Sequence, residues 1–318
     1  MKKIIPLVLI TILAILAFTS CSKTPTPLDD RISIVSTIFP SYDFARSIVG
    51  DKANVSMLLP PASESHSFEP SPQDILKIKN CNVFIYVGGE SDKWMSKILA
   101  SIDTSKIKII SLIDCVKTVE EVVVEGMQEE KEEHAHEHGK HKKEYDEHVW
   151  TSPINAKLIV QNISDTLCEI DKDNAKTYTD NMKDYLKKLD KLDGMFKDIV
   201  KNASRKTIIF GDRFPFRYFT DAYGLEYFAA FPGCSTETDA NAATVKFLID
   251  KMKAKKIPVV FHIELSNKKM ANAIAEETNA KVLLLHACHN ISKLDFDAKK
   301  SYIDLMTDNV QSLKEALK

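Results

Sequence analysis

Residues 154–203 read INAKLIVQNISDTLCEIDKDNAKTYTDNMKDYLKKLDKLDGMFKDIVKNA, and they separate two similar halves of the chain. The stretch contains no proline and a single glycine, Gly194. From Ala175 to Val200 apolar residues recur at the spacing of an amphipathic helix, which would be about 39 Å long. We expect a linker helix at 173–203 that joins two lobes; the alternative is an ordinary surface helix within one domain.

Each half carries four apolar runs of strand length, separated by helix-like segments. They are ISIVSTIF, ANVSMLL, NVFIYVG and IKIISLI in the first half, and KTIIFG, LEYFAAF, IPVVFHIE and AKVLLLHA in the second. Strands that alternate with helices are typical of parallel α/β sheets. We therefore predict an α/β fold with two lobes, 31–172 and 204–318. Each lobe has a mainly parallel four-stranded sheet flanked by helices, and one long rigid helix joins the two.

The chain begins with a short apolar segment behind two lysines, MKKIIPLVLITILAILAFTSC. The uncharged run from Ile4 to Phe18 is shorter than the about 20 residues that a membrane-spanning helix needs, which favours an export signal. Cys21 then predicts a lipoprotein signal peptide at 1–20 and a lipid-anchored tether at 21–30. A plain secretory signal is the alternative. We expect an extracytoplasmic protein, lipid-anchored to the cell membrane through Cys21.

The composition excludes two classes of protein. There are 43 basic and 45 acidic residues, a formal net charge of −2, which gives no electrostatic basis for binding nucleic acid. Besides Cys21, the cysteines are odd in number and widely spaced, so they do not indicate a disulfide scaffold. They are Cys81, Cys115, Cys168, Cys234 and Cys288. One pair, Cys234 with Cys288, could still form outside the cell.

Two stretches place a histidine shortly before a Ser-Pro pair: PASESHSFEPSPQD at 61–74 and DEHVWTSP at 146–153. A helix start explains the Ser-Pro pairs, because serine is a good N-cap and proline suits the first helical position. It does not explain His66 and His148, which lie in connections rather than in apolar stripes.

Polar side chains also follow the predicted strands in both halves. In parallel α/β sheets, ligands bind beyond the carboxyl ends of the strands. Imidazoles gathered there beside a carboxylate suit zinc or a similar first-row cation. The sequence therefore predicts a metal site in a cleft between the lobes. The polar residues at these strand ends are His66 after ANVSMLL, Asp212 and Arg213 after KTIIFG, Glu264 at the end of IPVVFHIE, and His286 and His289 after KVLLL.

The remaining histidines lie in a charged tract and within a strand run. The acidic, His-rich tract precedes the second Ser-Pro motif and cannot bury a core, so we expect a mobile loop at 125–145. Its histidines are weak metal sites or, alternatively, part of a solvated loop without function. They are His134, His136, His138 and His141. His262 lies within the strand run, where core packing accounts for it.

From Ile32 to the C-terminus the chain resembles the metal-binding lipoproteins of bacterial zinc and manganese ABC transporters, the cluster A-I solute-binding proteins. The resemblance implies two α/β lobes joined by one rigid helix, with metal in the cleft. A His-rich loop before the second motif is typical of the zinc branch. The motifs are HSFEPSPQD, DEHVWTSP, the helix of 175–200, FRYFTDAYGL, GCSTETDANAATVKFLIDKMK and VVFHIELSNKKMANAIAEET.

The resemblance also implies a ligand set. His66 matches the first ligand and His148 the second. The third position holds Arg213, which stays protonated and cannot ligate a cation. We expect Arg213 to pair with an acid and Asp212 beside it to serve instead.

The fourth ligand falls in HACHN, where His286 or His289 takes its place, and Glu264 is a further candidate. Three imidazoles suit Zn²⁺ better than Mn²⁺.

The implied function is capture of Zn²⁺ outside the membrane and delivery to an ABC transporter permease and its ATPase, by a monomer that is not an enzyme. One alternative is a manganese-binding protein of the same family, and another is a zinc-storage or adhesin lipoprotein. A zinc hydrolase would need an open coordination position and a general base, such as Glu69 or Glu264. Neither HExxH nor GxSxG occurs in the sequence.

Overall fold

The computed structural model describes residues 30–65, 67–89, 92–128, 145–235 and 240–318. The predicted signal peptide, Cys21, His66 and the four histidines of the acidic tract lie outside these residues. The chain divides into two units, Met1–Arg31 and Ile32–Lys318, and the second unit is the folded body. None of the helices that the structure describes is long and apolar enough to cross a membrane.

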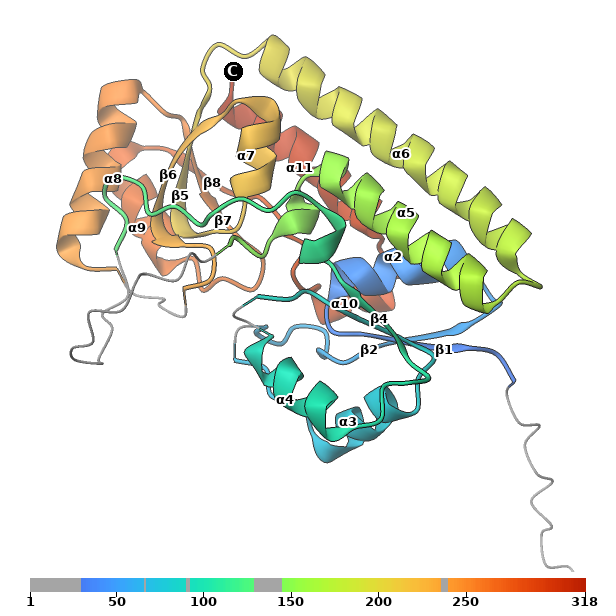
Figure 1. The fold of residues 1–318 in the computed structure, drawn as a ribbon. Coiled ribbons are helices and arrows are strands. Elements are labelled where there is room, and N and C mark those ends of the chain that lie inside the picture. The colour runs from blue at the N-terminus through green and yellow to red at the C-terminus, as the bar shows by residue number, and fades with distance from the viewer. Residues whose placement is uncertain (1–29, 66, 90–91, 129–144, 236–239) are drawn as a thin grey trace, which may run out of the picture. The chain divides into compact units, whose positions relative to one another are not determined.

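The first half contains a parallel four-stranded sheet with helices on both faces (Figure 1). The strand order is β2-β1-β3-β4. Alternate residues of the strands face opposite helices: Ile34 and Ile85 pack in the cluster that includes α2, whereas Val35 and Phe84 pack with α3 and α4. The elements are β1 (Ser33–Ser36), α2 (Phe39–Val49), β2 (Asn54–Met57), α3 (Pro72–Lys79), β3 (Val83–Tyr86), α4 (Lys93–Ser101) and β4 (Lys108–Ser111).

The second half repeats this plan in the strand order β6-β5-β7-β8, again with all strands parallel. Helices α8 and α9 cover one face, over Ile209 and Val260, and Phe210 and Phe261 face the other side. The elements are β5 (Thr207–Phe214), α7 (Arg217–Tyr223), β6 (Glu226–Pro232), α8 (Ala242–Lys255), β7 (Val259–His262), α9 (Lys269–Thr278), β8 (Lys281–Leu284), α10 (Lys293–Asp297) and α11 (Tyr302–Ala316). The predicted fold class is confirmed.

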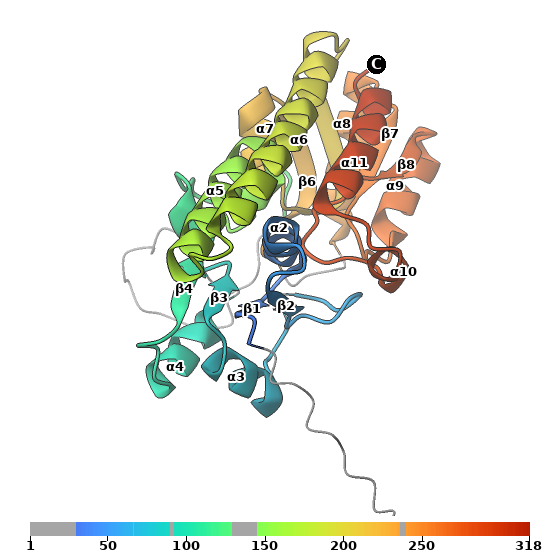
Figure 2. The ribbon, with the colours of Figure 1, turned by 90° about the vertical axis from the view of Figure 1, so that its right-hand side faces the viewer.

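Two helices connect the halves, α5 (Pro153–Ile170) and the 27-residue α6 (Ala175–Lys201). Helix α6 runs from the first half to the second, with α11 and α2 packed against it (Figure 2). Its apolar stripe is buried along its whole length, from Tyr178 to Val200. The long connecting helix is therefore present as predicted, whereas the lobe boundaries at 31–172 and 204–318 remain predictions.

One hydrophobic cluster runs through both halves and fixes them to each other. The ring of Tyr302, at the start of α11, lies 5.0 Å from the ring of Phe44 in α2. The backbone N–H of Tyr302 donates to the buried carboxylate of Asp43 at 2.9 Å, and the Tyr185 hydroxyl of α6 donates to the same oxygen at 3.0 Å. A helix of the second half is thus bound to the first half, and the carboxyl ends of the two sheets are held in a defined relation.

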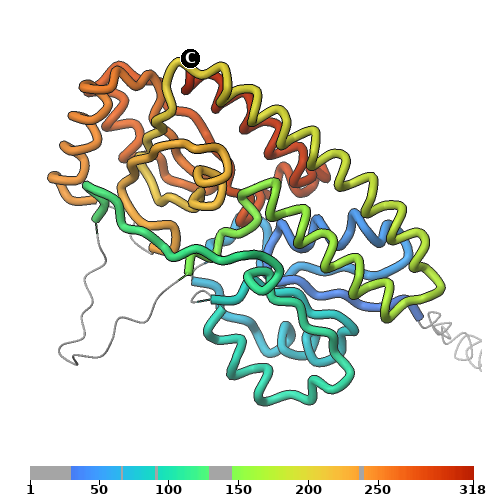
Figure 3. Tube along the Cα trace, turned by 45° about the horizontal axis from the view of Figure 1, so that its top comes forward, coloured from blue at the N-terminus to red at the C-terminus, as the bar shows by residue number. Residues whose placement is uncertain are grey.

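Residues 116–128 leave the first sheet and extend across the second half (Figure 3). The backbone N–H of Gln128 donates to the carbonyl of Ala230 in β6 at 2.9 Å, and Lys251 of α8 pairs with Glu125 at 3.0 Å. Tyr145 forms an isolated antiparallel bridge with Glu120. Residues 125–128 and Tyr145, at the two ends of the predicted 125–145 loop, are therefore bonded to other described residues. The prediction of a mobile loop at 129–144 concerns residues outside the described ones.

Candidate metal centre

A small cavity lies between the two halves, beyond the carboxyl ends of the strands, where parallel sheets place their ligands. Its volume is ≈ 20 Å³, which is room for about one water-sized particle. Both halves contribute to its wall. The lining residues are Ser63, Glu64, Ser65, His148, Arg213, Pro215, Gly233, Ile263, Glu264, Leu265, Ala287, His289 and Asn290.

His148 enters this cavity from the first half and is fully buried. Its Nδ1 lies 3.1 Å from Oδ1 of Asp146, and its backbone N–H donates to the same oxygen at 2.8 Å. Burial alone would lower the pKa of His148, but the charge and hydrogen bond of Asp146 outweigh it, so the pKa is raised. A carboxylate on Nδ1 leaves Nε2 as the metal-binding nitrogen, as in many zinc sites. Gly233 lies close by: a Cβ there would be 2.9 Å from Cε1 of His148.

His289 meets His148 from the second half. Their ring centroids are 5.3 Å apart and the rings are nearly perpendicular, at 86°. The indole of Trp150 lies 4.9 Å from the His289 ring, and its Nε1 donates to the carbonyl of Ala287 at 2.8 Å. The fold therefore brings together two imidazoles that are 141 positions apart in the sequence and leaves both on the cavity wall.

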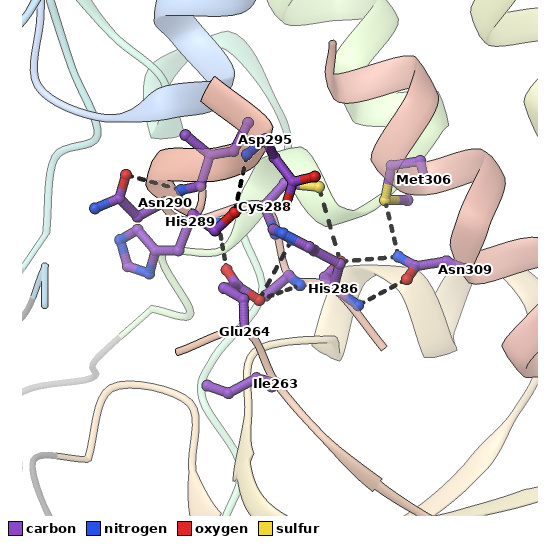
Figure 4. A network of polar contacts seen from close by, with 12 residues as sticks. Ile263, Glu264, His286, Cys288, His289, Asn290, Asp295, Met306 and Asn309 are labelled. Atoms are coloured by element: carbon purple, nitrogen blue, oxygen red, sulfur yellow. Dashed lines mark hydrogen bonds and ion pairs between the residues drawn. The ribbon is translucent and has the colours of Figure 1, made fainter. Parts of the chain in front are cut away.

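Glu264 lies beside these histidines, and both of its oxygens are engaged by the loop that follows β8 (Figure 4). Oε2 accepts the backbone N–H of Ala287 at 2.6 Å, and Oε1 accepts that of His289 at 2.8 Å. Nδ1 of His286 lies 3.5 Å from Oε2. The carboxylate thus holds the loop that carries His289 in place.

His286 belongs to the same loop, and its backbone bonds to Asn309 of α11 (Figure 4). Its backbone N–H donates to Oδ1 of Asn309 at 2.7 Å, and Nδ2 of Asn309 donates back to the His286 carbonyl at 2.8 Å. Its Nδ1 accepts the backbone N–H of Cys288 at 2.9 Å. His286 is buried and does not line the cavity.

Asp212 and Arg213 lie at an irregularity in β5, whose pairing with β6 shifts between Phe210 and Arg213. Such bulges commonly redirect side chains beside functional sites. Oδ1 of Asp212 accepts the backbone N–H of Arg213 at 2.8 Å, and Oδ2 accepts that of Ile263 at 3.3 Å. Asp212 thus links β5 to the end of β7 and does not line the cavity.

Arg213 does line the cavity, and it pairs with an acid as expected. Its Nη2 and Nη1 lie 3.0 and 3.3 Å from the two carboxylate oxygens of Glu64, and Nη1 also donates to the carbonyl of Ser235 at 3.2 Å. The partner, Glu64, stands two positions before His66 in the sequence.

His66 itself lies outside the described residues, but the chain that precedes it is hydrogen-bonded to the second half. Nδ2 of the buried Asn290 donates to the carbonyls of Pro60 and Ser63 at 2.8 and 2.7 Å, and Ser65 lines the cavity. Within the described part of the chain, no three His, Cys, Asp or Glu side chains gather closely enough to hold a metal ion. His148 and His289 are the two described imidazoles on the cavity wall.

Several residues that shape the site were not predicted from the sequence. Asp146 stands two positions before His148, and this spacing could have identified it, but Asn290 and Glu64 carry no local signal. Cys234 and Cys288 are both free, so the suggested pair does not form. His262 is buried in β7, where its Nδ1 lies 2.8 Å from the carbonyl of Ile263, in keeping with core packing.

Comparison with known proteins places this geometry in context. The model of the family "Zinc-uptake complex component A periplasmic" matches residues 34–316. The chain is 32% identical over 288 residues to the high-affinity zinc uptake system protein ZnuA of Bacillus subtilis, covering 91% of this chain and 88% of that protein. It is 30% identical over 315 residues to the zinc-binding lipoprotein AdcA of Streptococcus pneumoniae, covering 99% of this chain.

The chain spans 61% of the length of AdcA, so it corresponds to part of that protein. The crystal structure of the Zn(II)-bound ZnuA-like domain of Streptococcus pneumoniae AdcA superposes with a TM-score of 0.74 at 27% identity. That match covers 90% of this chain and 99% of the domain.

Proposed function

Because the chain belongs to the family of zinc-uptake complex component A, we propose that it is the extracytoplasmic zinc-binding component of an ABC transporter. It captures Zn²⁺ in the cavity between its two halves and delivers the ion to a membrane permease. The observation that carries this proposal is the meeting of His148 and His289, from different halves, at 5.3 Å across one small cavity.

The chemistry of the cavity suits zinc as the transported ion. His148 and His289 offer two imidazoles, and His66 supplies a third from the loop that Asn290 holds. Imidazole nitrogens bind Zn²⁺ at about 2.0–2.1 Å, and a set of imidazoles favours zinc over manganese. Asp146 fixes the tautomer of His148, while Glu264, Asp212 and His286 hold the backbone around the site.

Membership of the family supports a proposal for the partners and the location. The permease receives the ion, its ATPase drives the transport, and lipid on Cys21 holds the chain at the outer face of the cell membrane. The relatives named lipoproteins support the anchor. The protein acts as a monomeric carrier rather than as an enzyme, and the cavity beside His148 and His289, with room for about one small ion, is in keeping with a carrier.

A metal titration of the purified chain tests this function. We expect about one tightly bound Zn²⁺ per chain, with weaker binding of Mn²⁺, in a competition assay against a chromogenic chelator. Deletion of residues 129–144 distinguishes a transport protein from a zinc-storage protein. The tight ion should remain after the deletion, whereas loss of stoichiometric zinc would favour a storage protein whose site is the His-rich tract.

A further inference from the structure

We propose that Arg213 is a specificity-determining residue of the metal site. By holding the carboxylate of Glu64, it keeps an anionic oxygen ligand away from the cation and makes the site favour Zn²⁺ over Mn²⁺. This inference rests on the function proposed above. It assigns a role to an arginine at a position where the sequence resemblance implies a metal ligand.

Arg213 is fixed at the cavity wall by three contacts. The two guanidinium contacts to Glu64, at 3.0 and 3.3 Å, are bidentate, and the third goes to the carbonyl of Ser235 at 3.2 Å. The arginine side chain is 12% exposed. A guanidinium presents its donors in a rigid planar fork that matches a carboxylate, so a pair of this geometry holds both oxygens at once.

Glu64 and Glu264 are the carboxylates among the described residues that line the cavity. The oxygens of Glu264 accept the backbone N–H groups of Ala287 and His289, at 2.6 and 2.8 Å, and its side chain is 7% exposed. Turning Glu264 toward a cation would leave the backbone N–H groups of Ala287 and His289 without this acceptor. Glu64 is 43% exposed, and its Oε1 also accepts the backbone N–H and the hydroxyl of the adjacent Ser65 at 3.1 and 3.4 Å. Arg213 holds it from the second half, so a substitution of Arg213 would release the carboxylate from that half.

Ligand chemistry connects this pair to metal choice. The fixed positive charge of Arg213 repels Zn²⁺ and Mn²⁺ alike, because the two ions carry the same charge. The difference between them comes from the donors: imidazole suits Zn²⁺, whereas carboxylate oxygens suit Mn²⁺. A cavity that offers imidazoles and withholds its carboxylates therefore discriminates against Mn²⁺.

The test uses dissociation constants for Zn²⁺ and Mn²⁺, measured by chelator competition on the full soluble chain. Arg213→Gln should release Glu64 and reduce the preference for Zn²⁺ over Mn²⁺ by about tenfold, mainly through tighter Mn²⁺ binding. The double variant Arg213→Gln with Glu64→Gln should restore the preference. Arg205→Gln is the matched control, because Arg205 binds carbonyls near the C-terminus, away from the cavity.

Two further measurements exclude a merely structural role. Bound Co²⁺ should show an altered visible spectrum in Arg213→Gln, as expected when an oxygen donor joins the ion, and a wild-type-like spectrum in the double variant. Glu64→Gln alone should leave the preference within about threefold, because the carboxylate is withheld in either case. If Glu64→Gln by itself weakens Mn²⁺ selectively, Glu64 is already a ligand and the proposal is overturned.

The outcomes separate this inference from the proposed function. A wild-type chain that binds no Zn²⁺ tightly overturns the function. A wild-type chain that binds Zn²⁺ while Arg213→Gln keeps its preference overturns only the role of Arg213. Should Arg213→Gln not fold, Arg213→Lys takes its place. Lysine keeps the charge but lacks the fork, so a smaller shift toward Mn²⁺ is expected, and an unchanged preference contradicts the proposal.

Discussion

The two ends of the loop from Leu285 to Ile291 serve different parts of the molecule. At one end His286 bonds to Asn309 of α11 and accepts from Cys288, within its own half. At the other end His289 faces His148 and Trp150 of the first half, with ring centroids 5.3 and 4.9 Å away. Identical side chains three positions apart therefore stabilise the loop at one end and line the cavity at the other.

The turn between the two ends accounts for the difference. Cys288 adopts the left-handed backbone conformation, with φ at 60°, and turns the chain between the two histidines. Asn290 then binds the loop of residues 60–63, so the second end belongs as much to the first half as to the second. The residues around a histidine, rather than its place in a motif, therefore decide its role.

Removal of His289 should have the largest effect on metal binding. His289→Ala takes away one of two imidazoles that face each other across the cavity, and we expect zinc affinity to fall by at least about 100-fold. Chelator competition measures the loss, with His286→Ala as the matched control from the same loop. Equal losses in the two variants would erase the contrast between the two ends.

Asp146→Asn should have the next largest effect, because it removes the charge that orients His148. We expect zinc affinity to fall by about 10–100-fold, which is typical when the partner of a ligating histidine is lost. Asp190→Asn, at an exposed pair with Lys157, is the control and should change little. An unchanged affinity in Asp146→Asn would mean that His148 does not depend on its buried carboxylate.

The same pair predicts how zinc binding depends on pH. Asp146 raises the pKa of His148 despite its burial, so His148 takes up a proton at a pH above its ordinary pKa of about 6.5. From that pH downward, protons compete with zinc for this imidazole. In the metal-free protein, the raised pKa adds stability below that ordinary value, and this stability is lost as the pH rises through the raised pKa. The rise in Tm on adding Zn²⁺ should therefore shrink as the pH falls. In Asp146→Asn the decline should begin at lower pH.

Asn290→Ala should have a moderate effect, since it frees the loop that leads to His66. Two hydrogen bonds to partly exposed carbonyls are lost, each worth about 0.5–1.5 kcal/mol, so we expect a loss of about 1–3 kcal/mol in unfolding free energy and about tenfold in zinc affinity. Urea unfolding and chelator competition measure the two. Asn202→Ala, at the exposed end of α6, is the control. Loss of stability without any loss of affinity would show that the loop needs no anchor.

His286→Ala should have the smallest effect on metal binding. The backbone N–H of Cys288 loses its acceptor, which costs about 1–3 kcal/mol of unfolding free energy, while zinc affinity stays within about threefold. Urea unfolding with and without Zn²⁺ separates the two quantities. A collapse of affinity would place His286 in the site after all.

Much of the fold could be predicted from the sequence, because strands that are buried on both faces appear in it as continuous apolar runs such as KTIIFG and IPVVFHIE. The even apolar stripe of α6 indicated its length. The crossing of residues 116–128 to the second half was not predictable, since it depends on single bonds such as that of Gln128 to Ala230.

The site was predictable only in part. The Ser-Pro motif singled out His148 and the strand-end rule singled out His286 and His289, but which of those two lines the cavity depends on the backbone turn at Cys288. The pairing of Arg213 with an acid followed from the charge of the guanidinium. Its partner could not be named, because Glu64 is 149 positions away and nothing local links the two.

The anchored ends of the His-rich tract have a consequence for the local concentration of metal-binding groups. The tract of 129–144 leaves the described chain at Gln128, bonded to β6, and returns at Tyr145, three positions before His148. If the histidines between these two ends bind zinc, as the sequence predicts, they are tethered to the same folded body as the cavity. Groups tethered to one body meet at an effective concentration that does not depend on the dilution of the protein.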